Sequence, residues 1–476
     1  MTKRVGIILA LLLVICCLPL PALAASSDHH LDGAGLSPLW MIPFICMLLS
    51  LALLPLLTPH FWHDNFGKIA LFWAAAFAIP CAVVFGPGMA AYLVIHAMLL
   101  EYVPFILLMF CLFTVSGGIC VTGDLAGSPR VNLLILVIGT VLASWMGTTG
   151  ASMLLIRPLL RANAHRQYRV HSVIFFLFLV ANIGGSLTPL GDPPLFLGFL
   201  KGVSFFWPTT HLFAKTLVLS VILLALYYAL DSYLFNREGR PEAPSDEDTP
   251  PEKIQLQGKV NLVLLLGVVG AVLLSGTWKP GVVFDIYGTE VELQNAVRDA
   301  LMVVIALLSL WLTKAEYRAM NSFNWEPILE VAKLFVGIFI SMAPVVAILQ
   351  AGDQGVLAPV IALLSDDAGQ PVNKMYFWLT GFLSFFLDNA PTYLVIFNTA
   401  GGDPALLMGE WADTLTAIST GTVFFGAITY IGNAPNFMVR SIAVNQGVPM
   451  PSFFAYMGWS MSILFPCFAL LTLIFY

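Results

Sequence analysis

Polar residues interrupt a long apolar run in the stretch FLDNAPTYLVIFN, residues 386–398. Asp388, Asn389 and Pro391 stand together there, and the tripeptide Asn-Ala-Pro returns at 433–435 in YIGNAPNFMV. Carboxylate and amide oxygens are ligands for hard cations, and an acid in apolar surroundings can also carry a proton. The pattern therefore indicates ion binding or proton transfer inside an apolar environment.

Four such interruptions occur, two in each half of the sequence. They read GTTGASMLL (147–155), NIGGSLTPLGDPPLFL (182–197), LDNAPTYLV (387–395) and YIGNAPNFMV (430–439). Non-helical backbone at membrane depth is tolerated only where protein or a water-filled cavity surrounds it. Its freed N–H and carbonyl groups need partners, which a bound ion or substrate can supply. A proline kink explains any one break, but four breaks at matching places favour a functional site.

The expected site combines two acids with amide, hydroxyl and backbone groups from these breaks. Asp388 and Asp192 are the candidate ligands of a transported Na⁺, because an acid inside a membrane span is a functional candidate by default. Asp192 can also cap a helix that starts at Pro193, and Asp388 can bond locally at a hairpin tip. The further candidates for ion or substrate binding are Asn389, Asn433, Thr148, Thr149, Asn182, Thr188, Thr392, Asn436, Gly191 and Gly432.

The composition excludes a soluble protein. Of the 476 residues, 59% are hydrophobic and 10% are charged, whereas soluble chains carry about 25% charged residues. We therefore expect an all-α polytopic membrane protein. The net charge of −6 argues against a nucleic-acid partner. The seven cysteines show no metal-ligand spacing, and we expect no cofactor, with Na⁺ acting as substrate or coupling ion.

Residues 1–24 predict a cleavable signal peptide. Lys3 and Arg4 precede an apolar stretch at 5–18, and Ala22-Leu23-Ala24 offers a cleavage site between small residues. An uncleaved first span is the alternative.

The remaining chain divides into two halves with the same order of elements: three spans, a hairpin, a broken helix and a final span. The polar, acidic, proline-containing stretch 236–258 predicts a cytoplasmic linker between them. The first repeat covers 25–235, with a hairpin at 131–160 and a broken helix at 171–206. The second repeat covers 259–476, with a hairpin at 374–400 and a broken helix at 414–445.

Basic residues near the span ends set the orientation. Four arginines crowd one loop that has no acid: Arg157, Arg161, Arg166 and Arg169. With that loop in the cytoplasm, the two halves have opposite orientations, which is an inverted-topology repeat. We expect a bacterial-type inner membrane, with the mature N-terminus and the C-terminus periplasmic. The same count places Glu101, before a third span at 102–121, and Lys201 towards the outer surface.

At the interruptions the sequence resembles the ion transporter superfamily, which includes citrate and dicarboxylate carriers, arsenite permeases and NhaD-type sodium/proton antiporters. It is most similar to the citrate transporter subgroup, many of whose members are labelled sodium/proton antiporters. The resemblance implies two re-entrant hairpins and two unwound helices in a mobile domain, which moves like an elevator against a scaffold in a homodimer. It places the hairpin tips at 147–152 and 388–392 and the unwound regions at 184–193 and 431–436.

One departure concerns the substrate. The dicarboxylate branch carries Ser-Asn-Thr at its hairpin tips, whereas the tips here read Gly-Thr-Thr-Gly and Asp-Asn-Ala-Pro-Thr. A carboxylate substrate needs an arginine partner or bound cations in its place, and no arginine lies near either tip. Two acids without a central base fit a cation better.

The sequence thus predicts a secondary active transporter, with Na⁺(Li⁺)/H⁺ antiport by alternating access. The alternatives are a Na⁺- or H⁺-coupled carboxylate (citrate or dicarboxylate) symporter and a metalloid oxyanion efflux permease. Its partners would be membrane lipid, inorganic cations, protons and, in the alternatives, small carboxylates. No GxSxG motif lies in the spans and no HExxH motif occurs, so we do not expect an enzyme. Paired hairpins around one site also fit a carrier better than a passive channel.

Overall fold

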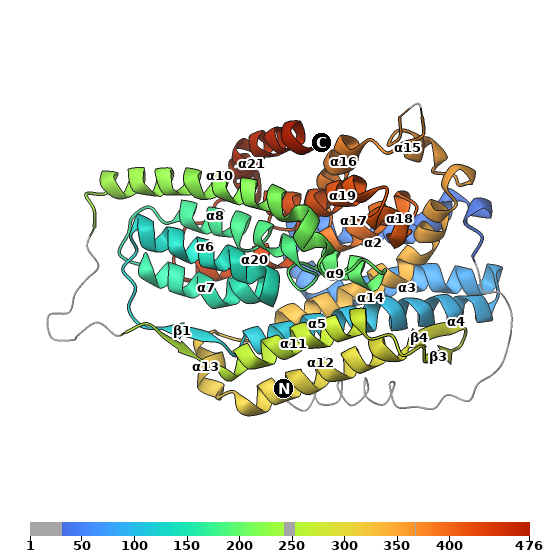
Figure 1. Cartoon of the computed structure of the whole chain (residues 1–476), viewed down its shortest axis with the longest axis horizontal. Coiled ribbons are helices and arrows are strands. Elements are labelled where there is room, and N and C mark those ends of the chain that lie inside the picture. The colour runs from blue at the N-terminus through green and yellow to red at the C-terminus, as the bar shows by residue number, and fades with distance from the viewer. Residues whose placement is uncertain (1–30, 242–252, 367) are drawn as a thin grey trace.

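The computed structural model describes residues 31–241, 253–366 and 368–476 (Figure 1). The predicted signal peptide lies outside these residues. In the described part of the chain, ten helical segments are long and apolar enough to cross a membrane, and strands form only two small two-stranded sheets. The expectation of an all-α polytopic membrane protein is confirmed.

The elements of the first half, in chain order, are η1 (Gly33–Gly35), η2 (Pro38–Met41), α2 (Ile42–Leu57), α3 (Pro59–Val84), α4 (Pro87–His96), η3 (Ala97–Tyr102), α5 (Val103–Ser116), β1 (Cys120–Thr122), α6 (Pro129–Met146), α7 (Thr148–Ala162), α8 (Val170–Leu179), η4 (Ile183–Leu187), α9 (Pro193–Leu200) and α10 (Trp207–Arg237).

Those of the second half are β2 (Gln255–Gln257), α11 (Val260–Thr277), β3 (Val283–Ile286), β4 (Thr289–Glu292), α12 (Leu293–Leu312), α13 (Ala315–Met320), α14 (Glu326–Gln350), η5 (Gly352–Gln354), α15 (Ala358–Ala362), α16 (Asn373–Phe386), α17 (Asn389–Thr399), α18 (Pro404–Met408), α19 (Ala412–Phe425), η6 (Gly426–Ile428), α20 (Ala434–Asn445) and α21 (Phe453–Phe475).

The four interruptions predicted from the sequence are present as breaks in helices. Helices α6 and α7 form a hairpin that turns at Gly147, whose φ of +80° suits glycine. Helices α16 and α17 form a second hairpin. The segment from α8 to α9 is broken around η4, and the segment from α19 to α20 is broken around η6. Whether the hairpins re-enter a membrane stays a prediction.

The third span differs from the prediction. It was expected to begin at 102, but one continuous helical segment runs from Pro87 to Ser116, with the π-helical turn η3 in its middle. Glu101 therefore lies inside this span, where it is 8% exposed. The predicted boundary was wrong because Glu101 has no partner near it in the sequence and was therefore placed outside the span. In the structure, Lys201 Nζ lies 2.5 Å from Glu101 Oε1.

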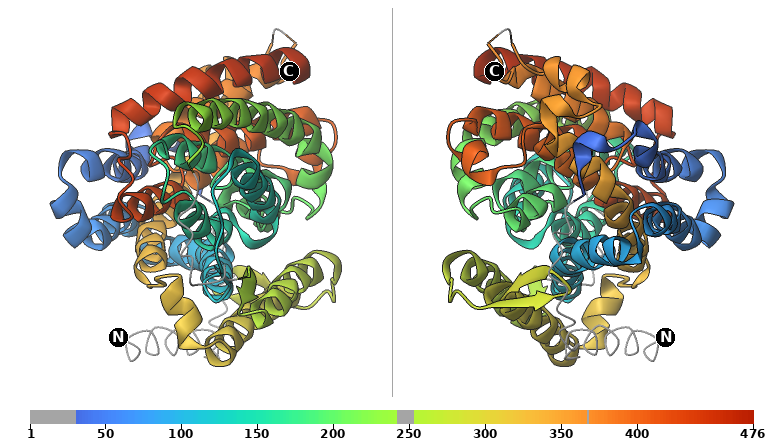
Figure 2. Two further views of the ribbon diagram at one scale, coloured as in Figure 1. Left: turned by 90° about the vertical axis from the view of Figure 1, so that its left-hand side faces the viewer. Right: turned by 90° about the vertical axis from the view of Figure 1, so that its right-hand side faces the viewer.

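The helices pack as two groups (Figure 1). The first group contains the hairpins, the broken helices and the helices that follow them: α6, α7, α8, α9, α10, α16, α17, α19, α20 and α21. The second group contains α2, α3, α4, η3, α5, α11, α12 and α14. The end-on views place α21 at one edge of the molecule and α11 and α12 at the opposite edge (Figure 2). The two groups meet where α14 packs on α17 and α5 packs on α7.

The connection between the two halves is anchored to the second group. Strand β1, after α5, pairs antiparallel with β2, before α11, with Val121 opposite Leu256. Part of the stretch expected to be a linker is therefore ordered, because α10 continues to Arg237 and β2 forms at Gln255–Gln257. Residues 242–252 lie outside the description.

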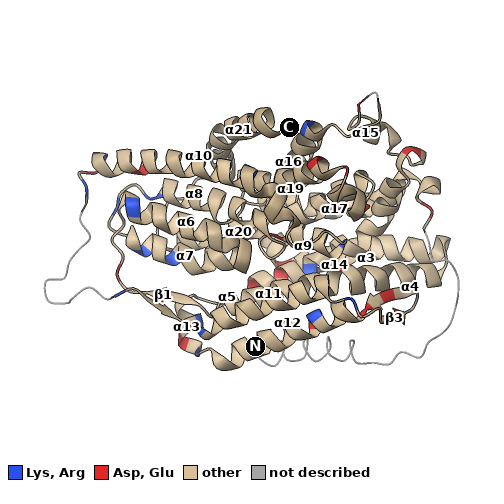
Figure 3. Cartoon of the chain, in the orientation of Figure 1, with Lys and Arg blue, Asp and Glu red and all other residues tan. Residues whose placement is uncertain are grey.

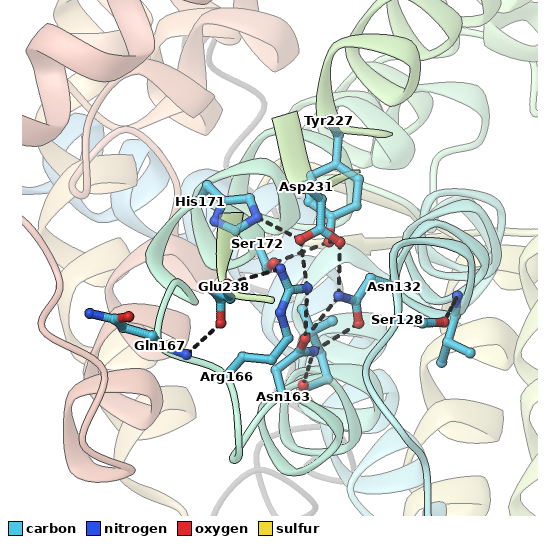
Figure 4. Close-up of polar contacts among 12 residues, drawn as sticks. Ser128, Asn132, Asn163, Arg166, Gln167, His171, Ser172, Tyr227, Asp231 and Glu238 are labelled. Atoms are coloured by element: carbon cyan, nitrogen blue, oxygen red, sulfur yellow. Dashed lines mark hydrogen bonds and ion pairs between the residues drawn. The ribbon is translucent and has the colours of Figure 1, made fainter. Parts of the chain in front are cut away.

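Charged residues lie mostly at helix ends and in loops (Figure 3), but one buried charge lies within α10. Asp231 is fully buried, and Arg166 Nη1 lies 2.6 Å and His171 Nε2 2.9 Å from its Oδ1 (Figure 4). Its Oδ2 accepts hydrogen bonds from Asn132 Nδ2 at 3.0 Å and from Tyr227 Oη at 3.2 Å. This network ties both ends of the first hairpin and the start of α8 to α10.

Replacing Asp231 with alanine should destabilise the protein by about 3 kcal/mol, because a buried ion pair that loses one partner leaves an uncompensated charge. Arg166 would keep the longer 3.4 Å ion pair with Glu238 and a 3.4 Å hydrogen bond to Asn163 Oδ1. Unfolding in detergent, followed by circular dichroism, measures the loss. The control is His63→Gln, since the His63–Glu326 pair is 68% and 65% exposed and should contribute less than about 1 kcal/mol. Equal losses in both variants would contradict the prediction.

Candidate ion-binding site

The side chain of Asp192 joins all four interruptions. Asp192 stands at the N-cap of α9 and is 1% exposed. Its Oδ1 accepts hydrogen bonds from Thr148 Oγ1 at 3.1 Å and from Asn433 Nδ2 at 2.9 Å. Its Oδ2 accepts one from Asn389 Nδ2 at 2.6 Å. One buried carboxylate thus takes donors from both hairpins and from the other broken helix.

A chain of amides extends from this carboxylate across the two halves. Asn433 Nδ2 also lies 3.2 Å from Asn182 Oδ1, and Asn182 Nδ2 donates to Asn436 Oδ1 at 2.7 Å. Asn436 Nδ2 in turn donates to the carbonyls of Gly426 and Thr429, both at 2.8 Å. These bonds supply partners for carbonyl groups that the broken helix leaves free.

Two amide oxygens beside Asp192 are left without partners. The Oδ1 atoms of Asn389 and Asn433 are buried and accept no hydrogen bond, while their amide nitrogens point to the carboxylate. An unsatisfied buried acceptor costs about 1–3 kcal/mol. A cation or a proton donor near Asp192 would remove that cost.

The same local geometry recurs in both halves. Thr188 Oγ1 donates to the carbonyl of Ser144, and Thr429 Oγ1 donates to the carbonyl of Phe385 at 2.7 Å; in each pair the residues are 44 positions apart. Each residue of the second pair follows its counterpart in the first pair by 241 positions, and Asn433 follows Asp192 by the same number. The repeated contacts support the prediction of two related halves.

Glycines let the backbone cross itself beside the site. The Cα of Gly191 lies so close to the carbonyl of Gly185 that no Cβ fits between them. In the second half a Cβ on Gly432 would lie 2.7 Å from the carbonyl oxygen of Gly426. Gly191 also accepts a backbone hydrogen bond from Thr148 at 2.9 Å, which fixes the first hairpin tip against the broken helix.

Helix N-termini surround the carboxylate. Helices α7, α9, α17 and α20 all begin at or next to residues that contact Asp192, namely Thr148, Asp192 itself, Asn389 and Asn433. The partial positive charge at each N-terminus favours an anion, which offsets part of the cost of burying this carboxylate.

Asp388, Thr392 and Thr149 make no described hydrogen bond to Asp192. Asp388 caps its own helix, with Oδ1 accepting from the backbone nitrogen of Ala390 at 3.0 Å. Thr392 Oγ1 donates to the carbonyl of Asp388 at 2.9 Å, and Thr149 is half-buried. No described hydrogen bond links the carboxylate of Asp388 to that of Asp192. Among the candidates, Asp192, Asn389, Asn433, Thr148, Asn182 and Asn436 form the connected set.

Sequence reasoning missed the residues that support this set. Ser144 and Thr429 fix the broken helices. The two Asn-Ala-Pro motifs are 44 residues apart, and the same spacing separates Phe385 from Thr429, so this repeat was a signal in the sequence. Asp231 was also missed, although an acid four residues before the end of an apolar span is itself a signal.

The site is a poor match for a tightly bound metal. Within the part of the chain that the structure describes, no group of three or more His, Cys, Asp or Glu side chains could hold a metal ion. A cation at Asp192 would rely on one carboxylate and neutral oxygens, and a low ligand charge weakens cation binding. Weak binding suits an ion that must be released on the other side.

Broken helices that meet at a buried acid, within a fold of many apolar helices, are features of membrane transporters. The sequence matches the family described as "Putative citrate transport" over residues 33–476, and the chain belongs to this family. It is 25% identical over 332 residues to a protein named as an uncharacterized transporter in Mycobacterium tuberculosis, covering 68% of this chain and 72% of the relative. A "46 kDa membrane protein" of Mycobacterium leprae is 25% identical over 335 residues, with the same coverage of both chains.

Replacing Gly191 with alanine should destabilise the fold by about 1–3 kcal/mol, because the added Cβ forces the two crossing backbones apart. The matched control is Gly458→Ala in α21, where nothing lies within 4 Å of the new Cβ. There alanine should be neutral or slightly stabilising, owing to its better helix propensity. Thermal unfolding of both variants in detergent tests this, and a stable Gly191→Ala protein would contradict the described crossing.

Proposed function

We propose that this transporter exchanges Na⁺ or Li⁺ for protons by alternating access. One observation carries the proposal: the buried carboxylate of Asp192 lies beside two amides whose oxygens, on Asn389 and Asn433, have no partner. The carboxylate and the two amide oxygens can bind a small cation, or they can share a proton. Asp388, next to Asn389 at the hairpin tip, is the second carboxylate of the proposed site.

The exchange follows from the limited number of oxygens. With Asp192 ionised and a cation bound, rotation of the Asn389 and Asn433 amides would turn their oxygens to the ion. With Asp192 protonated, its hydroxyl would donate to one of those oxygens, and the cation would lose its charged ligand. The two states use the same atoms and exclude each other, so the cation and the proton travel in turn.

Charge also favours a cation over an anion. The hydrogen bonds described for Asp192, Asn389 and Asn433 involve no lysine or arginine. A carboxylate substrate at this position would face the negative charge of Asp192 with no basic side chain to offset it.

Carboxylate symport is the second candidate. Helix α7 begins at Thr148 with no side-chain cap. The N–H of Thr148 donates to Gly191, and the N–H groups of the next two residues would bind the anion. The family description names citrate. In this alternative, Asp192 and Asp388 would hold coupling Na⁺ or H⁺, and the hairpin N-termini would bind the carboxylate. A metalloid oxyanion efflux permease would use the same N-termini.

The membrane arrangement is part of the same proposal. The arginine-rich segment around the end of α7 supports a cytoplasmic position for that end, with both termini of the mature protein on the periplasmic side of a bacterial-type inner membrane. The inverted repeats would provide the two access states, and the protein would act as a homodimer.

Purified protein in proteoliposomes with an internal pH-sensitive dye tests the exchange. After a proton gradient is imposed, added Na⁺ or Li⁺ should collapse it in the wild type, whereas K⁺ should not. Asp192→Asn should lower the rate by at least about tenfold, since it removes the charge that the cation needs. Asp388→Asn keeps a good N-cap residue and so tests the charge of Asp388 separately from its cap.

The alternatives give different results in the same assay. If cations alone leave the gradient intact, but citrate moves together with Na⁺ or H⁺, the antiport proposal is wrong and carboxylate symport replaces it. A gradient that collapses equally fast in wild type and Asp192→Asn would show that Asp192 does not bind the ion.

The exchange should also depend on pH in a defined direction. A proton and the cation compete for Asp192, so the apparent affinity for Na⁺ should rise as the pH rises, by about tenfold per pH unit while the cation-free site is protonated. Initial rates at several Na⁺ concentrations and pH values measure this. An apparent affinity that stays constant with pH would contradict competition at one site.

A further inference from the structure

An ion pair lies between the two groups of helices, away from Asp192. Lys201 Nζ is 2.5 Å from Glu101 Oε1, and the two side chains are only 28% and 10% exposed. Lys201 directly follows α9 of the first group, and Glu101 belongs to the π-helical turn η3 of the second group. A π-helical turn within a longer helix is often found at a functional position.

This pair differs from the other ion pairs of the described residues. His63–Glu326 lies between α3 and the start of α14, inside the second group, and Arg298–Asp299 joins neighbours within α12. The Asp231 network lies inside the first group. Among the described ion pairs, only Lys201–Glu101 crosses from one group to the other.

Helix α9 connects this ion pair directly to the candidate ion site. Asp192 occupies the N-cap position of α9, without a capping bond from its side chain, and Lys201 follows the C-terminus. One rigid helix of 8 residues, about 12 Å long, therefore carries both. Between them, the ring of Phe196 lies 5.9 Å from the guanidinium carbon of Arg298 on α12. Any movement of Asp192 relative to the second group must therefore change the position of Lys201 relative to Glu101.

We propose that Glu101 and Lys201 form a latch, which holds the first group in one position against the second and opens during each transport cycle. In the latched position the carboxylate neutralises a lysine that is largely removed from solvent. When α9 moves, the two charges separate, and the latched position loses its electrostatic stabilisation. The proposal rests on movement of the two groups relative to each other during transport, and it does not depend on which ion is carried.

Reversible cross-linking tests whether the latch must open. In the Glu101→Cys/Lys201→Cys variant, a reducible bis-methanethiosulfonate reagent should lower the flux at least tenfold for whichever of Na⁺, Li⁺ or citrate the wild type moves. Reduction should restore it. The matched control is Thr122→Cys/Gln255→Cys, which links paired residues of the small sheet formed by β1 and β2 and should leave the flux unchanged. The two single-cysteine variants account for reaction at native cysteines.

A second measurement needs no substrate. Spin labels on Leu226 of α10 and Leu266 of α11, which are 46% and 71% exposed, report the distance between the groups in a cysteine-free background. The neutral variant Glu101→Gln/Lys201→Met should shift the populations of the two groups' positions by about fivefold. The control His63→Gln/Glu326→Gln neutralises an ion pair inside one group and should leave the distances unchanged.

The outcomes decide the proposal independently of the carried ion. Full flux through the cross-linked Glu101→Cys/Lys201→Cys protein would overturn it, because the two residues would then not separate. Identical spin-label distances with and without the Glu101–Lys201 charges would overturn it as well. Loss of flux on cross-linking, together with shifted distances, would support the latch even if the transported species proves to be citrate.

Discussion

A carboxylate that is removed from water must find its hydrogen-bond donors inside the protein, and Asp192 imposes this constraint on the whole fold. The free energy of a buried charge is tolerable only with several donors close by. Here the donors are Thr148, Asn389 and Asn433, at 3.1, 2.6 and 2.9 Å. None of them lies on the helix that follows Asp192, so the chain must bring three distant breaks to one point.

The close approach of those breaks explains features that look unrelated in the sequence. The glycines at 185 and 191 remove side chains where the backbone crosses itself. Thr188 and Thr429 each bond to a carbonyl in the adjacent hairpin, which compensates backbone groups that a continuous helix would have paired. The resulting site has polar walls in an apolar protein, and its two unpartnered amide oxygens give it the capacity to accept a ligand.

Much of this architecture could be predicted from the sequence. Hydropathy identified the spans except for the start of the third one, and Gly, Pro and Asn within apolar runs located all four breaks, because few other residues end a helix there. Asp192, Asn389 and Asn433 were recognised by their chemical types. Their mutual contacts could not be predicted, because side-chain pairs 197 and 241 positions apart leave no local periodicity in the sequence. For Asp388 the sequence left ion binding and a local bond at the hairpin tip both open, and in the structure its carboxyl group bonds to its own helix.

Charges with distant partners were the least predictable part. Glu101 was read as the end of a span, because an unpaired acid marks a boundary and its partner lies 100 residues away. Asp231 was overlooked for a similar reason: its partners Arg166 and His171 lie 60 or more residues earlier in the chain. In both cases the sequence shows the cost of burying a charge but not the group that offsets it.

The amide chain from Asp192 through Asn433 and Asn182 to Asn436 constrains how the sequence of this protein can evolve. Neither half of the chain holds a complete site, because every described side-chain donor to Asp192 except Thr148 comes from the second half. A substitution at 192 would have to be answered by another at 389 or 433. The two halves, even if they began as copies, can therefore no longer diverge independently or be exchanged singly with those of a relative.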